Sequence, residues 1–183
     1  MKLLCFALPA YPCMKQGAFP GPEPHRNFSG MNIIRWPKAD RWVAGNIEDA
    51  DRLETLIGKQ ITVVPELAAC QYGEWSGRFL KAVPTEDLSL WLRDPEFVPP
   101  GGESRSMVTD RITHWLRNFG NENETVVLMV DADIVRILVL ICLGLDVTSA
   151  DRLDILPSSW SILSYVRNWR LQALSLPPDK VFF

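Results

Sequence analysis

Two carboxylates stand at the end of an apolar run, in the position where open α/β sheets keep their ligands. Asp131 and Asp133 directly follow residues Thr125–Val130, and a second apolar segment comes next. Carboxylate oxygens are the ligands that hard cations prefer, so the pair could hold a metal ion. The alternative is structural, with Asp133 as the N-cap of the next helix and Asp131 facing solvent or a backbone amide. The structural interpretation is favoured, because aspartate is among the commonest N-cap residues.

A proline-rich loop follows the first apolar run and is expected to border the same edge of the sheet. Residues 9–25 contain five prolines and two glycines, and each proline fixes φ and removes a backbone donor. Tyr11 is a candidate to line the pocket with its ring and hydroxyl, and His25 and Arg26 end the loop. His25 could be a base or a nucleophile. A surface position is favoured for it, because the sequence shows no partner.

The other candidate nucleophiles have no evident activating base. Cys13 and Cys70 stand without a basic neighbour, and His114 is expected on the exposed side of a helix. Cys5 and Cys142 lie in apolar runs, which is typical of small core residues. The cysteine spacing predicts neither a metal site nor a disulfide framework, which suits a reducing cytoplasm. No cofactor is expected.

The composition is that of a soluble globular protein. The 183 residues are 47% hydrophobic and 22% charged, so the length and composition predict one domain over residues 1–183. A net charge of −3 gives no bias toward nucleic acid or a membrane surface. The longest apolar run, residues 134–145, is interrupted by Arg136 and is too short to span a bilayer. The seven tryptophans are expected to serve packing first and a partner interface second.

Strands and helices alternate along the predicted chain. Hydrophobic patterning predicts strands at 2–8, 41–44, 61–65 and 125–130, and helices at 47–57, 86–92, 103–119 and 134–145. Thr85 is a candidate N-cap, and Met107, Ile112, Trp115 and Leu116 are expected near one face of their helix. Two β-rich runs, 159–165 and 169–174, predict an antiparallel pair. The pattern predicts an α/β fold, a three-layer α/β/α sandwich with a mostly parallel sheet.

Two glycine motifs in this order resemble those of a known family. They are Gly73-Glu74-Trp75-Ser76-Gly77 and Pro100-Gly101-Gly102-Glu103-Ser104. With the first strand, and with Arg136 after the later one, they resemble the histidine phosphatase superfamily, which is phosphoglycerate mutase-like. The resemblance covers residues 1–175 and implies the same three-layer fold. In size the chain is similar to small bacterial members such as α-ribazole phosphatase. Gly102, Glu103 and Ser104 are ligand-binding candidates, although their retention can be purely structural.

The same resemblance implies that the family's catalytic residues are absent. The family carries a nucleophilic histidine with a flanking arginine, a second arginine at a helix start, an acid and a second histidine. By this alignment Leu8 stands at the nucleophile, and the other positions read Ala7, Asp49, Ala69 and Asp131. Leucine has no lone pair with which to accept a phosphoryl group. The exchange also turns a cationic pocket into an acidic one, which would repel phosphate. Such a site would prefer an amine, a metal ion or the side chain of a Lys or Arg.

Three hypotheses remain open at this point. The first is a catalytically inactive pseudophosphatase that binds an unknown small molecule or protein. The second is an enzyme with relocated chemistry, either metal-dependent through Asp131 and Asp133 or dependent on His25. The third is a structural or dimer-forming subunit. No nucleic-acid or membrane partner is expected, a homodimer is compatible with the sequence, and the expected location is the cytoplasm.

Overall fold

The computed structural model describes residues 1–21, 25–119 and 123–180. Within them, one six-stranded sheet has the order β3-β2-β4-β1-β5-β6. Its strands are β1 (Lys2–Ala7), β2 (Arg41–Ala44), β3 (Thr62–Val63), β4 (Thr125–Val130), β5 (Ser159–Tyr165) and β6 (Trp169–Leu176). β1 to β4 are mutually parallel, whereas β5 runs antiparallel to both β1 and β6. The α-helices are α1 (Ile47–Ile57), α2 (Thr85–Arg93), α3 (Arg105–Asn118) and α4 (Ala132–Leu143).

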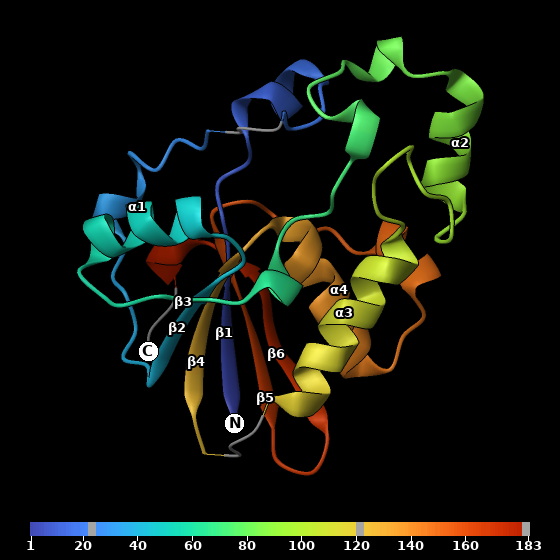
Figure 1. Cartoon of the computed structure of the whole chain (residues 1–183). Coiled ribbons are helices and arrows are strands. Elements are labelled where there is room, and N and C mark those ends of the chain that lie inside the picture. Colours follow the sequence, from blue (N-terminus) through green and yellow to red (C-terminus); the bar gives the residue numbers. More distant parts are fainter. Residues whose placement is uncertain (22–24, 120–122, 181–183) are drawn as a thin grey trace.

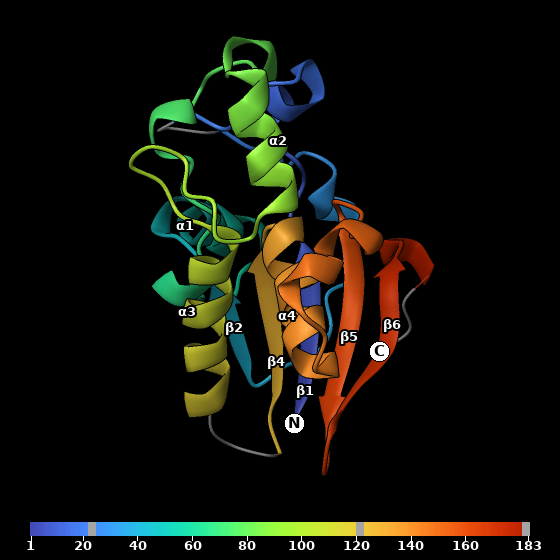
Figure 2. The same cartoon turned by 90° about the vertical axis from the view of Figure 1, so that its right-hand side faces the viewer.

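Helices cover both faces of the sheet and make a three-layer α/β/α sandwich, as the sequence predicts. α3 and α4 lie on one face and α1 on the other (Figures 1 and 2). Each face has its own apolar cluster, centred on α3 and α4 in one case and on α1 in the other. The central strands β1 and β4 are buried on both faces. Their nearly continuous apolar sequences follow from that double burial.

The carboxyl ends of the two central strands finish side by side. Ala7 pairs with Val130 at the last position of the parallel ladder. The next backbone amide, that of Leu8, donates to the Val130 carbonyl oxygen at 2.8 Å. Residues that follow β1 and β4 are therefore brought to one edge of the sheet, where parallel sheets place their functional loops.

Capping residues mark where the helices begin, and two sequence predictions about them need correction. Asn46 caps α1 by accepting from the Asp49 amide at 2.7 Å, and the helix ends at Gly58 in the left-handed conformation. The N-cap of α4 is Asp131, so the prediction that Asp133 is the cap was wrong. Thr85 was also wrongly predicted as a cap, because α2 begins at Thr85 itself and Pro84 is its N-cap.

The buried face of α3 contains Val108 in place of the predicted Met107. Val108, Ile112 and Trp115 are buried, whereas Met107 is 48% exposed. The buried positions are spaced by four and three residues, which is the spacing of one helix face. Met107 precedes this stripe by one residue and so points away from it.

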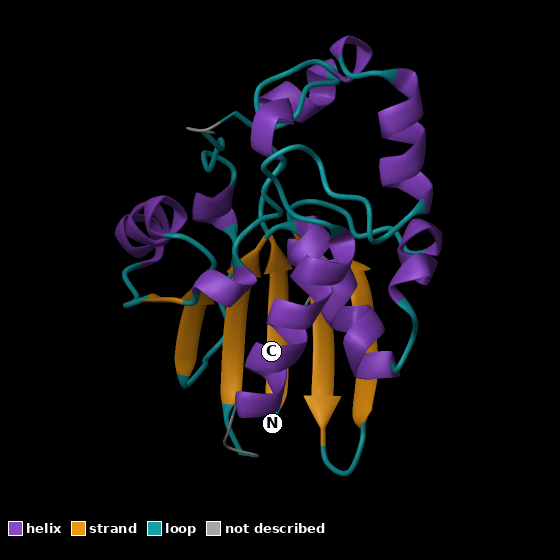
Figure 3. Ribbon diagram, turned by 45° about the vertical axis from the view of Figure 1, so that its right-hand side comes forward, coloured by secondary structure: helices purple, strands orange, loops and turns teal. Residues whose placement is uncertain are grey.

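A small aromatic lobe stands beyond the carboxyl ends of β1 and β4. It contains α2 and the irregular segments before and after it (Figures 1 and 3). Its core is a third apolar cluster, built around Phe19, Trp75 and Val83 with Tyr72 and Trp91 packed against them. The proline-rich loop joins this lobe, because the Phe19 amide donates to the Arg78 carbonyl oxygen at 2.9 Å. Pro22 and Pro24 of that loop lie outside the described residues.

The two glycine motifs pack backbone against backbone at the base of this lobe. Gly73 has φ of +54°, and a Cβ atom there would overlap the Pro100 carbonyl oxygen. A Cβ atom at Gly102 would come within 2.6 Å of the Gln71 carbonyl oxygen. The amides of Glu74 and Glu103 donate across the same junction at 2.8 Å each. This close approach gives both motifs a structural reason to be present without any catalysis.

Replacing Gly73 with alanine is expected to lower the free energy of unfolding by about 2–4 kcal/mol, from backbone strain and overpacking together. Gly58→Ala is the matched control, because Gly58 also has positive φ but no atom within 4 Å of the place that a methyl group would take. The control is expected to cost only about 1–2 kcal/mol, the strain of the left-handed conformation. Urea titration of both variants measures the difference. Equal losses would contradict the packing at this junction.

Most tryptophans serve packing, as predicted. Trp36, Trp42 and Trp160 form edge-to-face contacts on the α1 face of the sheet, and Phe6 lies among them. Trp75 and Trp91 contact each other in the aromatic lobe. Within the described part of the chain, no helix combines the length and the apolar character needed to cross a membrane.

Candidate functional site

Arg26 occupies the edge of the sheet where β1 and β4 end. Its side chain is buried, and all three guanidinium nitrogens have partners. Nε pairs with Asp49 Oδ2 at 3.2 Å, and Nη2 lies 2.6 Å from both carboxylate oxygens of Asp131. Nη1 donates to the Pro9 carbonyl oxygen at 2.6 Å. One guanidinium therefore ties together the start of α1, the end of β4 and the segment that leaves β1.

Two further contacts stabilise this arrangement, one with the guanidinium itself and one with its partner Asp49. The ring of Tyr11 lies against it, with the Arg26 Cζ atom 3.7 Å from the ring centroid, which is a cation–π contact. Asn46 Nδ2 donates to Asp49 Oδ2 at 2.9 Å and so orients the carboxylate. Because Asn46 also caps α1, the same residue fixes the helix start and the ion pair.

The charges of the site are coupled to one another. Burial works against the charged guanidinium of Arg26, but Asp131 and Asp49 outweigh it and raise its pKa. Burial raises the pKa of Asp131, an effect that the contact with Arg26 partly offsets. Burial and the Asp131 carboxylate raise the pKa of the Tyr11 phenol, which is therefore neutral. The result is a permanently charged arginine held between two carboxylates.

Leu8 is a core residue. It is 2% exposed and packs in the cluster on the α1 face together with Phe6 and Trp160. Ala7 is fully buried. The structure thus places Leu8, Asp49 and Asp131 at one edge of the sheet.

Ala69 belongs to a neighbouring group of residues. Its carbonyl oxygen accepts from Arg111 Nη2 at 3.3 Å, and Arg111 pairs with Glu103 at 3.1 Å. Glu103 also accepts from the Gln71 amide at 3.1 Å. Ser104 caps α3 by accepting from the Met107 amide at 3.1 Å. The ligand-binding candidates Glu103 and Ser104 therefore have structural contacts in this fold, as does Gly102 through its close packing.

The residues proposed for relocated chemistry do not gather into one site. Asp133 pairs with Arg136 at 3.0 Å, whereas Asp131 pairs with Arg26. The prediction that Asp131 faces solvent or a backbone amide was therefore wrong, because the guanidinium is the stronger partner. His25 is exposed. In residues 1–21, 25–119 and 123–180, no three His, Cys, Asp or Glu side chains are grouped so that they could hold a metal ion.

Cys70 is not activated. Burial, and secondarily the Glu103 carboxylate, raise the pKa of its thiol to about 12. A reactive cysteine needs the opposite shift. His114 is exposed and shares a 3.1 Å contact with Asn118 on the same helix, so it lies away from the strand ends.

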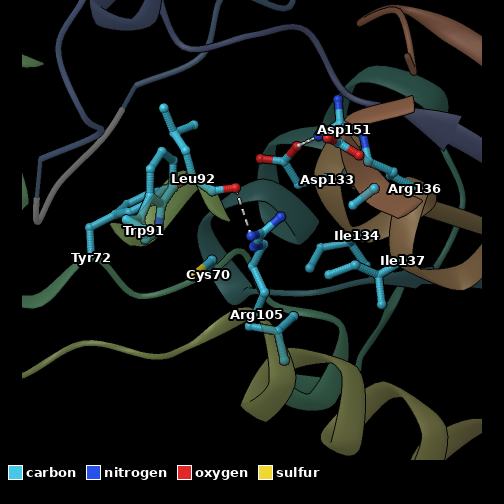
Figure 4. Close-up of a pocket in the computed structure, with 12 residues that line it drawn as sticks. Cys70, Tyr72, Trp91, Leu92, Arg105, Asp133, Ile134, Arg136, Ile137 and Asp151 are labelled. Carbon is cyan, nitrogen blue, oxygen red and sulfur yellow. Dashed lines mark hydrogen bonds and ion pairs between the residues drawn. The ribbon is translucent and has the colours of Figure 1, made fainter. Parts of the chain in front are cut away.

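A cavity of about 170 Å³ lies beside this site, between the aromatic lobe, α3 and α4 (Figure 4). Tyr72, Trp91 and Leu92 form one side, and Ile134 and Ile137 lie opposite (Figure 4). Arg105 and Arg136 contribute guanidinium groups to its lining. Sequence reasoning missed Trp91 and Arg105 as site residues. No sequence signal joins them, because they come from different helices that only the folded chain brings together.

Comparison with known protein families and solved structures assigns the class of this protein. The family model for the histidine phosphatase superfamily (branch 1) matches residues 47–175. The chain therefore belongs to the histidine phosphatase superfamily. A comparison with curated proteins gave no match.

Solved structures with the same fold include an α-ribazole phosphatase and a mycobacterial hydrolase. The α-ribazole phosphatase from Shigella flexneri has 17% sequence identity and a TM-score of 0.82, with 96% of each chain covered. The protein TTHB049 from Thermus thermophilus has 22% identity and a TM-score of 0.74, covering 96% of this chain and 99% of that one. A protein described as mycobacterial hydrolase 1 has 18% identity and a TM-score of 0.72, with coverage of 96% and 99%. At these identities the likeness concerns the fold.

Proposed function

We propose that this chain is a non-catalytic member of the histidine phosphatase superfamily, with a binding or regulatory role. The observation that carries the proposal is the position of Arg26, paired with Asp49 and Asp131 at the ends of β1 and β4. By the alignment with the family, this is where a phosphoryl group would be bound. The chain's own guanidinium takes that place.

The chemistry of the site supports this proposal in two ways. Leu8 and Ala7 offer neither a nucleophile nor a cation, since nucleophilic catalysis needs a lone pair on the attacking atom. A phosphate would also meet two carboxylates whose countercharge is already engaged. Two like unit charges 4 Å apart repel by about 4 kcal/mol at an effective dielectric constant near 20. Displacing Arg26 would free a cation but leave Asp49 and Asp131 unpaired.

Relocated chemistry has less support from the geometry. The Asp133 carboxylate is engaged with Arg136, and Asp131 is engaged with Arg26. A metal ion at Asp131 and Asp133 would have to compete with two guanidinium groups. His25 is exposed. Among the described residues, no acid or base contacts its ring in a way that would orient it for catalysis.

A phosphatase assay tests the proposal. The purified chain is incubated with p-nitrophenyl phosphate, with and without Mg²⁺ or Mn²⁺, beside the α-ribazole phosphatase from Shigella flexneri as the active control. We expect release of p-nitrophenol at the buffer rate under every condition. Acid-labile phosphate bound to the protein, or metal-free turnover, would contradict the proposal. Metal-dependent turnover that is lost in Asp131→Asn would replace it with relocated chemistry.

A further inference from the structure

Another cavity, of about 630 Å³, opens at the carboxyl edge of the sheet on the side of β5. It is lined by Pro9 after β1, by Ser158 before β5 and by part of the irregular segment 27–35. Because β5 is antiparallel to β1, its first residue lies at the same edge, where Ser159 pairs with Ala7. Small-molecule sites are concave spaces of about 300–1,000 Å³, and open α/β folds hold their ligands at this edge. The volume and the position therefore fit a small-molecule site.

An irregular stretch of chain forms the apolar floor of this cavity. A single turn of 3-10 helix, Met31–Ile33, borders it. Met31 is 2% exposed and belongs to the apolar cluster on the α1 face, and Ile34 packs against that cluster. Both residues also line the cavity. Its floor is therefore anchored in the core and does not have to be ordered when a ligand binds, which lowers the cost of binding.

Ser158 has a backbone conformation that glycine would adopt at a lower cost. Its φ is +58°, in the left-handed region that is unfavourable for a residue with a Cβ atom. Among the described residues, Ser175 is the other non-glycine residue with positive φ. The Ser175 hydroxyl is used within the fold, because it accepts from the Leu156 amide at 3.0 Å. The Ser158 hydroxyl has no hydrogen-bond partner in the described chain and Ser158 lines the cavity, so its side chain is suited to a contact with a ligand.

The polar residues of the lining offer donors that solvent can reach. Arg35 and Asn27 are exposed and Ser158 is half-buried, and Arg35 forms no ion pair with a described residue. Asn27 Oδ1 accepts from the Ser29 amide at 2.9 Å, which leaves the two N–H groups of Nδ2 for another acceptor. Asp179, the acidic residue of the lining, is already engaged by an interaction of its own. The lining thus offers one unpaired positive charge with neutral donors, which matches a ligand with a single negative charge.

We propose that this cavity binds an organic monocarboxylate with an apolar body of two or three rings, whose carboxylate accepts hydrogen bonds from Arg35 and Ser158. Guanidinium and carboxylate form charge-assisted hydrogen bonds, whereas a dianion would bring a second negative charge toward Asp179. The volume is about four times that of a cavity of about 150 Å³ that takes up benzene, so a larger body fits. The site goes beyond the non-catalytic role proposed above. It uses neither Asp49 nor Asp131, so its failure and the detection of phosphatase activity are separate results.

Ligand-observed ¹⁹F NMR with 6-fluoro-2-naphthoate tests the proposal on the full chain. We expect binding with a Kd below about 1 mM, which is ordinary for a ligand of this size. The neutral alcohol, 6-fluoro-2-naphthalenemethanol, is expected to bind at least about fivefold more weakly, since it loses the charge-assisted bonds. The dianionic 6-fluoro-2-naphthyl phosphate is expected to bind more weakly than the carboxylate. Absence of naphthoate binding would overturn the proposal, and equal binding of the alcohol or tighter binding of the phosphate would overturn the assignment of a monocarboxylate.

Variants of the lining place the binding in this cavity. Arg35→Gln is expected to weaken naphthoate binding about fivefold or more, because it removes the charged donor. Arg167→Gln is the matched control, since it removes the same charge from an exposed position in the turn between β5 and β6, at the opposite end of β5, and its Kd should be unchanged. Ser158→Gly is expected to weaken binding about threefold or more without lowering the urea midpoint of unfolding, because glycine accepts positive φ.

A larger residue at Gly30 provides a test that does not depend on charge. Gly30 lines the cavity, has φ of −84° and has no atom within 4 Å of the place that a Cβ atom would take. Gly30→Phe should therefore fold and weaken naphthoate binding about tenfold by occupying part of the cavity, whereas Gly30→Ala should bind as the wild type does. Unchanged binding in Arg35→Gln, Ser158→Gly and Gly30→Phe, or an equal loss in Arg167→Gln, would overturn the site.

Discussion

Replacing Arg26 with methionine is expected to lower the free energy of unfolding by about 3–5 kcal/mol, because it leaves two buried carboxylates without their countercharge. Asp49 and Asp131 would then face each other across the space of the guanidinium. The cation–π contact with Tyr11 is lost as well. Urea or thermal unfolding measures the change.

Arg41→Met is the control for this substitution. Arg41 pairs with Glu124 at 2.7 Å, but its side chain is 43% exposed, and exposed ion pairs contribute about 0–1 kcal/mol. The triple variant Arg26→Met/Asp49→Asn/Asp131→Asn should recover much of the loss, since it removes the unpaired charges together with their partner. A loss in Arg26→Met no larger than in Arg41→Met would contradict the buried pairing.

The defect of Arg26→Met should depend on pH with a defined sign. Burial already raises the pKa of Asp131, and Arg26 is the contact that lowers it. Without Arg26 the folded-state pKa rises further above the unfolded value of about 3.9. The folded variant then binds a proton that the unfolded chain has released, so its stability falls as the pH rises from about 4 through the folded-state pKa. The difference from wild type should therefore be smaller at pH 4 than at pH 7.

Restoring a histidine at position 8 is expected to destabilise the fold and to restore no catalysis. Leu8 is fully packed among apolar residues of the α1 face. Leu8→His removes a buried aliphatic side chain and places imidazole nitrogens among apolar neighbours, at a cost of about 3–5 kcal/mol. Arg26 would also remain paired with Asp49 and Asp131 beside the new side chain, which leaves the proposed phosphoryl position filled.

Leu8→Met provides the comparison, because a volume-conserving apolar substitution costs less than about 1.5 kcal/mol. Unfolding curves of both variants, together with the p-nitrophenyl phosphate assay, separate stability from activity. A Leu8→His chain with wild-type stability that becomes phosphorylated on the new histidine would contradict the account. Such a result would mean that only the nucleophile is missing.

Much of the fold could be predicted from the sequence, because its periodic segments are unambiguous. β2, α1, β4 and β5 have the predicted bounds, since each is a continuous or strictly spaced apolar pattern between strong stop signals. The predicted start of α4 was wrong, because the prediction relied on the capping preference of Asp133 alone, whereas the N-cap is Asp131. Either Asp131 or Asp133 can cap a helix in isolation. In the structure neither carboxylate serves as the cap, because Asp131 pairs with Arg26 and Asp133 pairs with Arg136.

The sequence predicted that the candidate site is acidic, but it did not predict that the side chain of Arg26 pairs with the acidic residues. The resemblance implied carboxylates at Asp49 and Asp131 and a preference for an amine, a metal ion or a Lys or Arg side chain. Arg26 satisfies that preference, although it lies 23 residues from Asp49 and 105 from Asp131 in the sequence. An irregular loop has no periodicity that would indicate where its side chains point.

The central claim is that Arg26 is held at the carboxyl edge of the sheet by its pairing with Asp131, and a double-mutant cycle tests this pairing most directly. The free energies of unfolding of wild type, Arg26→Met, Asp131→Asn and the double variant are measured at pH 7. The account predicts a coupling energy of about 2–3 kcal/mol, the upper range for residues in direct contact. A coupling energy near zero, with additive single effects, would contradict it.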